Sequence, residues 1–171
     1  MLNKICIRQA EPTDAPLLVR FMQQLYNESE YLLYDSEEWH HNIEVVKKHL
    51  TRMEEGQSVI FIAERLSNEI VGFVGGTVSS LKRLAHVMHV NIGVLNHYQG
   101  IGLGGKLSAR LNLYAHEAGI ERIEAMVIQE NKYSLNLCKK FGFSVEGIKK
   151  RAIKINNANY DVVLLSLFLS S

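Results

Sequence analysis

The sequence has little cysteine, little proline and almost no net charge. Its two cysteines, Cys6 and Cys138, provide neither a disulfide framework nor the ligand spacing of a metal site. The formal net charge of +1 indicates no strong field for nucleic acid. No apolar run approaches the length of a membrane span, and the N-terminus lacks the apolar stretch of a signal peptide. We therefore expect a cytoplasmic protein with no metal, no nucleic-acid partner and no membrane contact.

The composition that is present suits one folded domain. Of the 171 residues, 47% are hydrophobic and 22% are charged, and this length allows a sizeable core. There are no repeats and no low-complexity linker, so we predict a single domain over residues 1–171. Apolar alternation predicts strands at 3–9, 58–65, 70–78, 86–95, 121–129, 143–155 and 160–169. Helical spacing predicts four helices. The first covers 13–27 with an N-cap at Thr13-Asp14, and the second runs from a capping box at Asp35 and Glu38 to Gly56. The third and fourth cover 102–118 and 132–141.

This order of elements predicts an α/β fold with a mixed central sheet. The strands at 86–95 and 121–129 are joined by a crossover helix, and strands joined in this way are parallel. The last two strands flank Asn156-Asn157 and are expected to pair antiparallel.

A glycine-dense loop at residues 99–105 joins the strand at 86–95 to the following helix. The first turn of a helix has unpaired N–H groups and the positive end of the helix dipole. Glycine lets an anion approach the backbone closely, and four glycines between positions 100 and 105 need a reason of this kind. The loop therefore predicts a ligand that carries phosphate.

Three phosphate-binding patterns fit the loop. Residues 100–105 match G-x-G-x-x-G of dinucleotide folds, residues 100–106 match G-x-x-x-x-G-K of the P-loop, and residues 99–104 match Q-x-x-G-x-G of acyl-CoA enzymes. Leu107 replaces the Ser or Thr that a P-loop needs for magnesium. A dinucleotide fold needs several further βαβ units and an acid at a strand end, whereas Glu124 lies within its predicted strand.

The sequences around the loop resemble the GNAT superfamily of N-acetyltransferases. Val94 stands five residues before Gln99, where that family ends its fourth strand. Residues 131–143, Asn-Lys-Tyr-Ser-Leu-Asn-Leu-Cys-Lys-Lys-Phe-Gly-Phe, resemble the family pattern N-x-x-A-x-x-L-Y-x-x-x-G-F. The resemblance covers residues 58–169. Its C-terminal part is similar to the branch with ribosomal-protein N-terminal acetyltransferases, at Glu146-Gly147, Arg151 and Tyr160-Asp161.

The resemblance implies a GNAT-like fold, with a mostly antiparallel sheet, two splayed parallel strands, flanking helices and acetyl-CoA as the co-substrate. Loop N–H groups would hold the pyrophosphate, the backbone of residues 92–94 would bond the pantetheine, and the N–H of Val94 would face the thioester oxygen. The implied cofactor-binding residues are Ile92, Gly93, Val94, Gln99, Gly100, Ile101, Gly102, Leu103, Gly104, Gly105, Asn131 and Ser134.

Two residues are candidates for proton transfer. His89 lies near the position where many relatives place a glutamate base, and histidine changes protonation near neutral pH. Cys138 stands at the family's tyrosine position, where it would protonate the leaving thiolate or else only pack in the core. The resemblance to N-acetyltransferases implies that the amine attacks acetyl-CoA directly in a ternary complex.

The acceptor is predicted to be a primary amine, either a small molecule or a protein N-terminus. Residues 28–38 hold five acids and no Lys or Arg, which would attract a cationic amine, and Glu30 and Tyr31 are the candidate contacts. Fold analogy further suggests a homodimer. The alternatives to an acetyltransferase are a non-catalytic acyl-CoA sensor and a nucleotide-binding oxidoreductase module.

Overall fold

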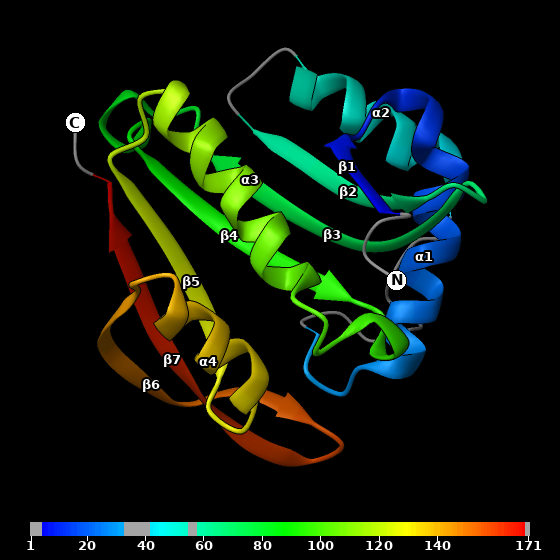
Figure 1. Ribbon diagram of the computed structural model, residues 1–171. Helices are drawn as coiled ribbons and strands as arrows, with labels where there is room; N and C mark the ends of the chain where they lie inside the picture. The colour runs from blue at the N-terminus through cyan, green and yellow to red at the C-terminus, as the bar shows by residue number, and fades with distance from the viewer. Residues whose placement is uncertain (1–4, 33–41, 55–57, 170–171) are drawn as a thin grey trace. The chain divides into compact units, whose positions relative to one another are not determined.

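The computed structural model describes residues 5–32, 42–54 and 58–169. Within these residues the chain forms four α-helices and seven strands in the predicted order (Figure 1). The strands are β1 (Ile5–Gln9), β2 (Val59–Arg65), β3 (Glu69–Val78), β4 (Val87–Val94), β5 (Arg122–Ile128), β6 (Ser144–Ile155) and β7 (Ala158–Phe168). The helices are α1 (Ala15–Glu28), α2 (Ile43–Glu54), α3 (Leu103–Glu117) and α4 (Lys132–Lys140).

The strands pair in the order β1-β2-β3-β4-β5-β7-β6. β4 and β5 are parallel, while the β1–β2, β2–β3, β5–β7 and β6–β7 pairs are antiparallel. This confirms the predicted mixed, mostly antiparallel sheet. Pairing between β4 and β5 runs from Val87–Arg122 to His89–Glu124, although β4 continues to Val94 and β5 to Ile128.

The chain divides into two compact units, which are described separately. The first comprises Met1–Thr77 and Asn91–Tyr114, and the second comprises Val78–Val90 and Ala115–Ser171. Since β4 contributes residues to both units, each unit contains one half of this strand.

In the first unit, helices lie on both faces of the strands. Gly72 and Phe73 are neighbours on β3 and therefore point to opposite faces. Gly72 lies against Leu107 of α3, whereas Phe73 makes an edge-to-face contact with Phe21 of α1 at 5.9 Å between ring centroids. The side chain of Phe61, on β2, is fully buried. The apolar alternation of β3 thus places one helix on each side of it.

The entry to α1 differs from the sequence prediction. A short 3-10 turn, Pro12–Asp14, precedes the helix, and Asp14 stands at the N-cap position without a side-chain cap bond. Its carboxylate instead accepts the backbone N–H of Glu11 at 2.8 Å and two guanidinium bonds from Arg8, each at 2.7 Å. The Arg8 bonds hold the pKa of the Asp14 carboxyl below its usual range, against the opposing effect of burial. The acid therefore fastens the β1–α1 connection to β1.

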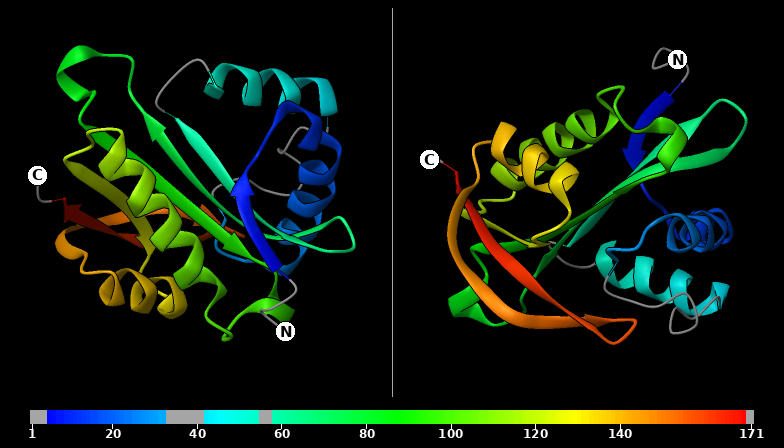
Figure 2. Two further views of the ribbon diagram at one scale, coloured as in Figure 1. Left: turned by 45° about the horizontal axis from the view of Figure 1, so that its top comes forward. Right: turned by 90° about the horizontal axis from the view of Figure 1, so that it is seen from below.

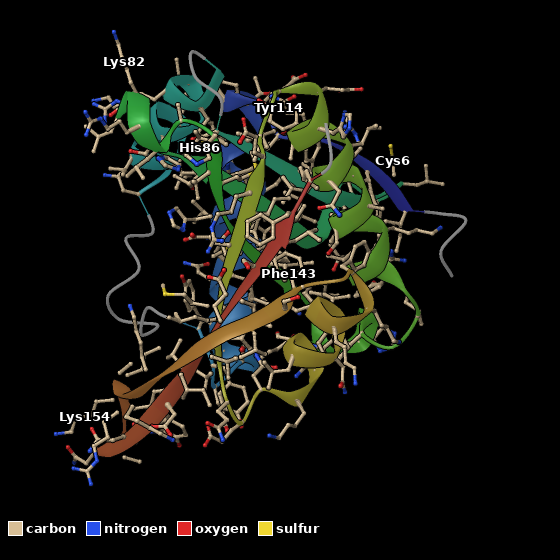
Figure 3. The ribbon with its side chains drawn as sticks, turned by 90° about the vertical axis from the view of Figure 1, so that its left-hand side faces the viewer. Cys6, Lys82, His86, Tyr114, Phe143 and Lys154 are labelled. Atoms are coloured by element: carbon tan, nitrogen blue, oxygen red, sulfur yellow. The ribbon has the colours of Figure 1, made fainter. Side chains whose placement is uncertain are left out.

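In the second unit, α4 packs on β5 and β7 (Figure 2). One buried cluster of this unit consists of four apolar side chains, Ala125, Val127, Val163 and Leu165. Leu135 and Cys138 of α4 and the ring of Phe143, labelled in Figure 3, pack against them. Lys154 lies toward the far end of the β6–β7 hairpin (Figure 3). None of the helices in the described part of the chain is long and apolar enough to cross a membrane.

Candidate active site

The glycine loop has the backbone conformation that an anion site at a helix N-terminus requires. Gly100 and Gly102 have φ values of +74° and +84°, a region that other residues enter at a cost of about 1–2 kcal/mol. A Cβ at either position would meet nothing within 4 Å, so conformation and not packing requires glycine there. The helical bond from Lys106 N–H to Gly102 O is 3.1 Å long. The N–H groups of residues 103–105 precede it in the first turn, where a helix offers its own N–H groups no acceptor.

Gln99 braces this loop through its side chain. Its Nε2 donates to Val94 O at 2.9 Å and to Asn96 Oδ1 at 3.0 Å. The Asn96 N–H in turn donates to Glu28 Oε2 at 2.7 Å, which ties the loop to the end of α1. The resemblance implied Gln99 as a cofactor contact, and the structure adds a role in holding the end of β4 and the loop together.

Gly93 is a packing glycine as well as a candidate cofactor residue. A Cβ at this position would overlap Leu25 of α1 and would lie 2.8 Å from the Phe73 ring. Glycine at position 93 therefore needs no ligand to explain it. Ile92 and Val94 flank it on the same half of β4, and Val94 is buried.

His89 forms a pair with Glu124 in the second unit. Its Nδ1 lies 3.3 Å from Glu124 Oε2, and the side chains are 59% and 31% exposed. His86, labelled in Figure 3, precedes β4, and its carbonyl accepts the N–H groups of Glu121 and Arg122 at 3.0 and 3.2 Å. His89 is thus the histidine of the two that has a carboxylate partner among the described ion pairs.

A polar network next to this pair was missed by sequence reasoning. Arg122 Nε donates to Glu124 at 2.7 Å, and its Nη1 donates to Glu146 at 2.8 Å. The buried hydroxyl of Ser166 also donates to Glu146, at 2.8 Å. The hydrogen bond from Arg122, and to a smaller extent the hydrogen bond from Ser166, lowers the pKa of Glu146 to about 2. In the sequence this network is signalled by the charged residues at positions 122 and 124, which are two residues apart and therefore lie on one face of β5.

Cys138 is a partly buried residue of α4. It packs on the Ala125–Val163 cluster, and burial raises the pKa of its thiol to about 11. The thiol is therefore protonated at neutral pH but is a weaker acid than an unperturbed thiol, whose pKa is about 8.5. Asn131 and Ser134 stand at the start of the same helix, where Asn131 Oδ1 caps the Ser134 N–H at 3.1 Å.

Both predicted acceptor contacts, Glu30 and Tyr31, lie within the described residues. Glu30 is exposed and Tyr31 is half-buried, and the N–H of Tyr31 donates to Ser29 Oγ at 3.4 Å. Three of the five acids in the 28–38 stretch lie outside the described residues. Glu28 has a bracing role, since its carboxylate accepts Asn96 N–H and Gln24 Nε2.

Comparisons with known proteins match this arrangement of strand, glycine loop and helix. The acetyltransferase (GNAT) domain model matches residues 7–164. A GNAT-family acetyltransferase from Streptococcus pneumoniae is 27% identical, with a TM-score of 0.92 over 96% of this chain and 99% of that one. The yncA protein of Salmonella typhimurium, solved with its cofactor acetyl-CoA, is 18% identical, with a TM-score of 0.87 over 98% and 95%. Ribosomal-protein-alanine N-acetyltransferase from Brucella melitensis is 20% identical, with a TM-score of 0.85 over 96% and 99%.

The fold and the loop define an α/β acyltransferase. Because the family model spans nearly the whole chain, the protein belongs to the GNAT family and is an acetyltransferase of that type.

Proposed function

We propose that this protein transfers acetyl from acetyl-CoA to a primary amine by direct attack in a ternary complex. The observation that carries the proposal is the braced glycine loop at the start of α3, with Gly100 and Gly102 at positive φ and open space where a Cβ would stand. Free first-turn N–H groups in a positive dipole field suit a pyrophosphate. The residues present therefore fit acetyl-CoA.

Different groups of the chain bind different parts of acetyl-CoA. The N–H groups of residues 102–105 hold the pyrophosphate, and the loop keeps its shape because Gln99 ties Val94 to Asn96. The backbone of residues 92–94 binds the pantetheine arm, with Asn131 and Ser134 as further contacts. Acetyl-CoA, when bound, supplies the activated acetyl group. The Val94 N–H donates to the carbonyl oxygen as negative charge develops on it.

The proton of the amine goes to His89. A primary amine is an ammonium ion at neutral pH and must lose a proton before it can attack. His89 is more than half exposed, so both an amine and water can reach it. Cys138 has a pKa of about 11, which makes proton transfer to a thiolate of ordinary pKa unfavourable. We therefore infer that Cys138 mainly packs the core and that the leaving thiolate takes its proton from elsewhere.

The acceptor that fits best is a cationic amine that ends in an accessible primary nitrogen. Exposed Glu30 and half-buried Tyr31 follow α1 and are its proposed contacts. A small amine and a protein N-terminus both satisfy this chemistry. A single domain, a homodimer and a cytoplasmic location complete the proposal.

A turnover assay tests the proposal. The release of free thiol from acetyl-CoA is measured with a panel of polyamines, amino acids and peptides with free N-termini, and we expect amine-dependent release with at least one of them. Gly102→Glu should abolish it, because a carboxylate would occupy the phosphate position and repel the ligand. Gly119→Glu is the matched control, since Gly119 also has positive φ and open space, at the C-terminal end of α3. Equal turnover in the two variants would contradict the loop assignment.

A further inference from the structure

The residue opposite His89 on β5 is a carboxylate. His89 and Glu124 are register partners on two parallel strands, and theirs is the last pair in the β4–β5 pairing. The separation of 3.3 Å is within ion-pairing range, although this contact is not among the described hydrogen bonds. Catalytic hydrogen bonds are commonly long before substrate binds. With the Nδ1 edge facing Glu124, Nε2 is the ring nitrogen left for another partner.

The carboxylate of Glu124 is shared between two neighbours. Its Oε1 accepts the Nε–H of Arg122 at 2.7 Å, and its Oε2 faces His89. Arg122 and Glu124 are two residues apart, so both side chains stand on the same face of β5. Each oxygen of Glu124 therefore has its own partner, and the carboxylate plane is held in one orientation.

Arg122 is itself held from two other directions. Its Nη1 and Nη2 bind both oxygens of Glu146, at 2.8 and 2.5 Å, and its guanidinium lies 5.2 Å from the centre of the Phe168 ring. Ser166, which is only 1% exposed, donates to Glu146 at 2.8 Å. The network thus runs from the buried hydroxyl of Ser166 to the exposed imidazole of His89.

The side chains around His89 carry a net negative formal charge. Arg122 contributes one positive charge, and Glu124 and Glu146 contribute two negative charges. When His89 gains a proton, the four side chains become neutral overall. A carboxylate at Nδ1 selects the neutral tautomer that carries its proton on Nδ1.

From this geometry we propose that Glu124 is a positioning residue, and this inference deepens the proposed function and rests on it. Glu124 accepts the Nδ1–H of neutral His89 and so leaves the Nε2 lone pair to take a proton from the attacking amine. The amine N–H bond breaks and the Nε2–H bond forms, while the Nδ1–H bond stays intact and Glu124 stays ionised. The proton on Nε2 then passes to solvent, which restores the base.

The test is a double-mutant cycle on the active enzyme. His89→Ala should lower kcat/KM for the amine by about 100-fold, the lower end of the usual contribution of a general base. Glu124→Gln keeps the side-chain shape and an acceptor for Arg122, and it should lower kcat by about tenfold with an unchanged KM for acetyl-CoA. The double variant should be no slower than His89→Ala alone, because Glu124 acts only through the imidazole. Glu69→Gln is the matched control, a strand glutamate paired with Arg65.

A second readout does not depend on turnover. Ring-nitrogen NMR of histidine-labelled protein at alkaline pH should show His89 with its proton on Nδ1, identified by the signal lost in His89→Ala. Glu124→Gln should move this signal toward the Nε2–H tautomer, whereas Glu69→Gln should not. An unchanged tautomer, a fully active Glu124→Gln or an additive double variant would each overturn the role of Glu124. A wild-type protein that acetylates no amine would instead overturn the proposed function, while the tautomer experiment would still decide whether the pair exists.

Discussion

At the scale of single residues, glycine serves two different purposes around the loop. Gly93 and Gly72 are needed because neighbouring side chains leave no room for a Cβ. Gly100 and Gly102 are needed because the backbone has positive φ there, although the space around them is open. Only the positive-φ glycines point to a ligand, because the space around them, beside the first turn of α3, is open.

At the same scale, the alkylation rate of Cys138 tests whether its thiol is activated. Thiolate is the reactive form of cysteine, and at pH 8 a pKa of about 11 leaves roughly one thiol in a thousand ionised, against roughly a quarter for an ordinary thiol. In a Cys6→Ser background, which removes the exposed cysteine, alkylation of Cys138 by iodoacetamide should be at least about 100-fold slower than that of free cysteine. The rate should rise about tenfold per pH unit up to about pH 10. A rate that levels off near pH 8 would show an activated thiol and return Cys138 to the candidates for proton transfer.

At the scale of elements, two polar links hold neighbouring elements in place. Asp14 joins the turn before α1 to Arg8 at the other end of the β1–α1 connection. Glu28 at the end of α1 holds the N–H of Asn96, 68 residues later. The second link fixes the loop that precedes α3, so α1 contributes to the candidate site although none of its helical residues was predicted to bind the cofactor.

The Asp14 link predicts how stability depends on pH. Its carboxyl has a pKa lowered by Arg8, so its contribution is present above the unfolded-state pKa of about 3.9 and is lost as pH falls through the lower folded-state value. Asp14→Asn should lower the free energy of unfolding by about 2 kcal/mol at neutral pH. In urea titrations this difference should shrink below about pH 4. Glu69→Gln, at an exposed ion pair, should change stability by less than about 1 kcal/mol. An Asp14→Asn difference that is constant down to about pH 3 would contradict the assignment.

At the scale of the whole molecule, local sequence patterns predicted the elements well. The described ends of the strands and of α1, α3 and α4 lie within two residues of their predicted positions, because periods of two and 3.6 are local properties. The capping box predicted at Asp35 and Glu38 lies outside the described residues, and the described part of α2 begins at Ile43. The family motifs also located the glycine loop, and they predict acetyl-CoA as the cofactor. They did not reveal the Gln99 brace, which depends on the conformation of the loop, or the link from Arg122 to Glu146, 24 residues away, which depends on register between strands. The packing role of Gly93 was missed for the same reason, since Leu25 and Phe73 reach it only in the folded chain.

The measurement that tests the central claim most directly compares the thermal unfolding of the wild-type protein with acetyl-CoA, NAD and ATP at equal excess. A ligand at 100-fold over its Kd stabilises the folded state by about 2.7 kcal/mol, which corresponds to a rise in Tm of roughly 5–10 °C for a chain of this size. We predict such a rise with acetyl-CoA and none of that size with NAD or ATP. A rise with NAD or ATP and none with acetyl-CoA would contradict the assignment of the loop between β4 and α3 as an acyl-CoA site.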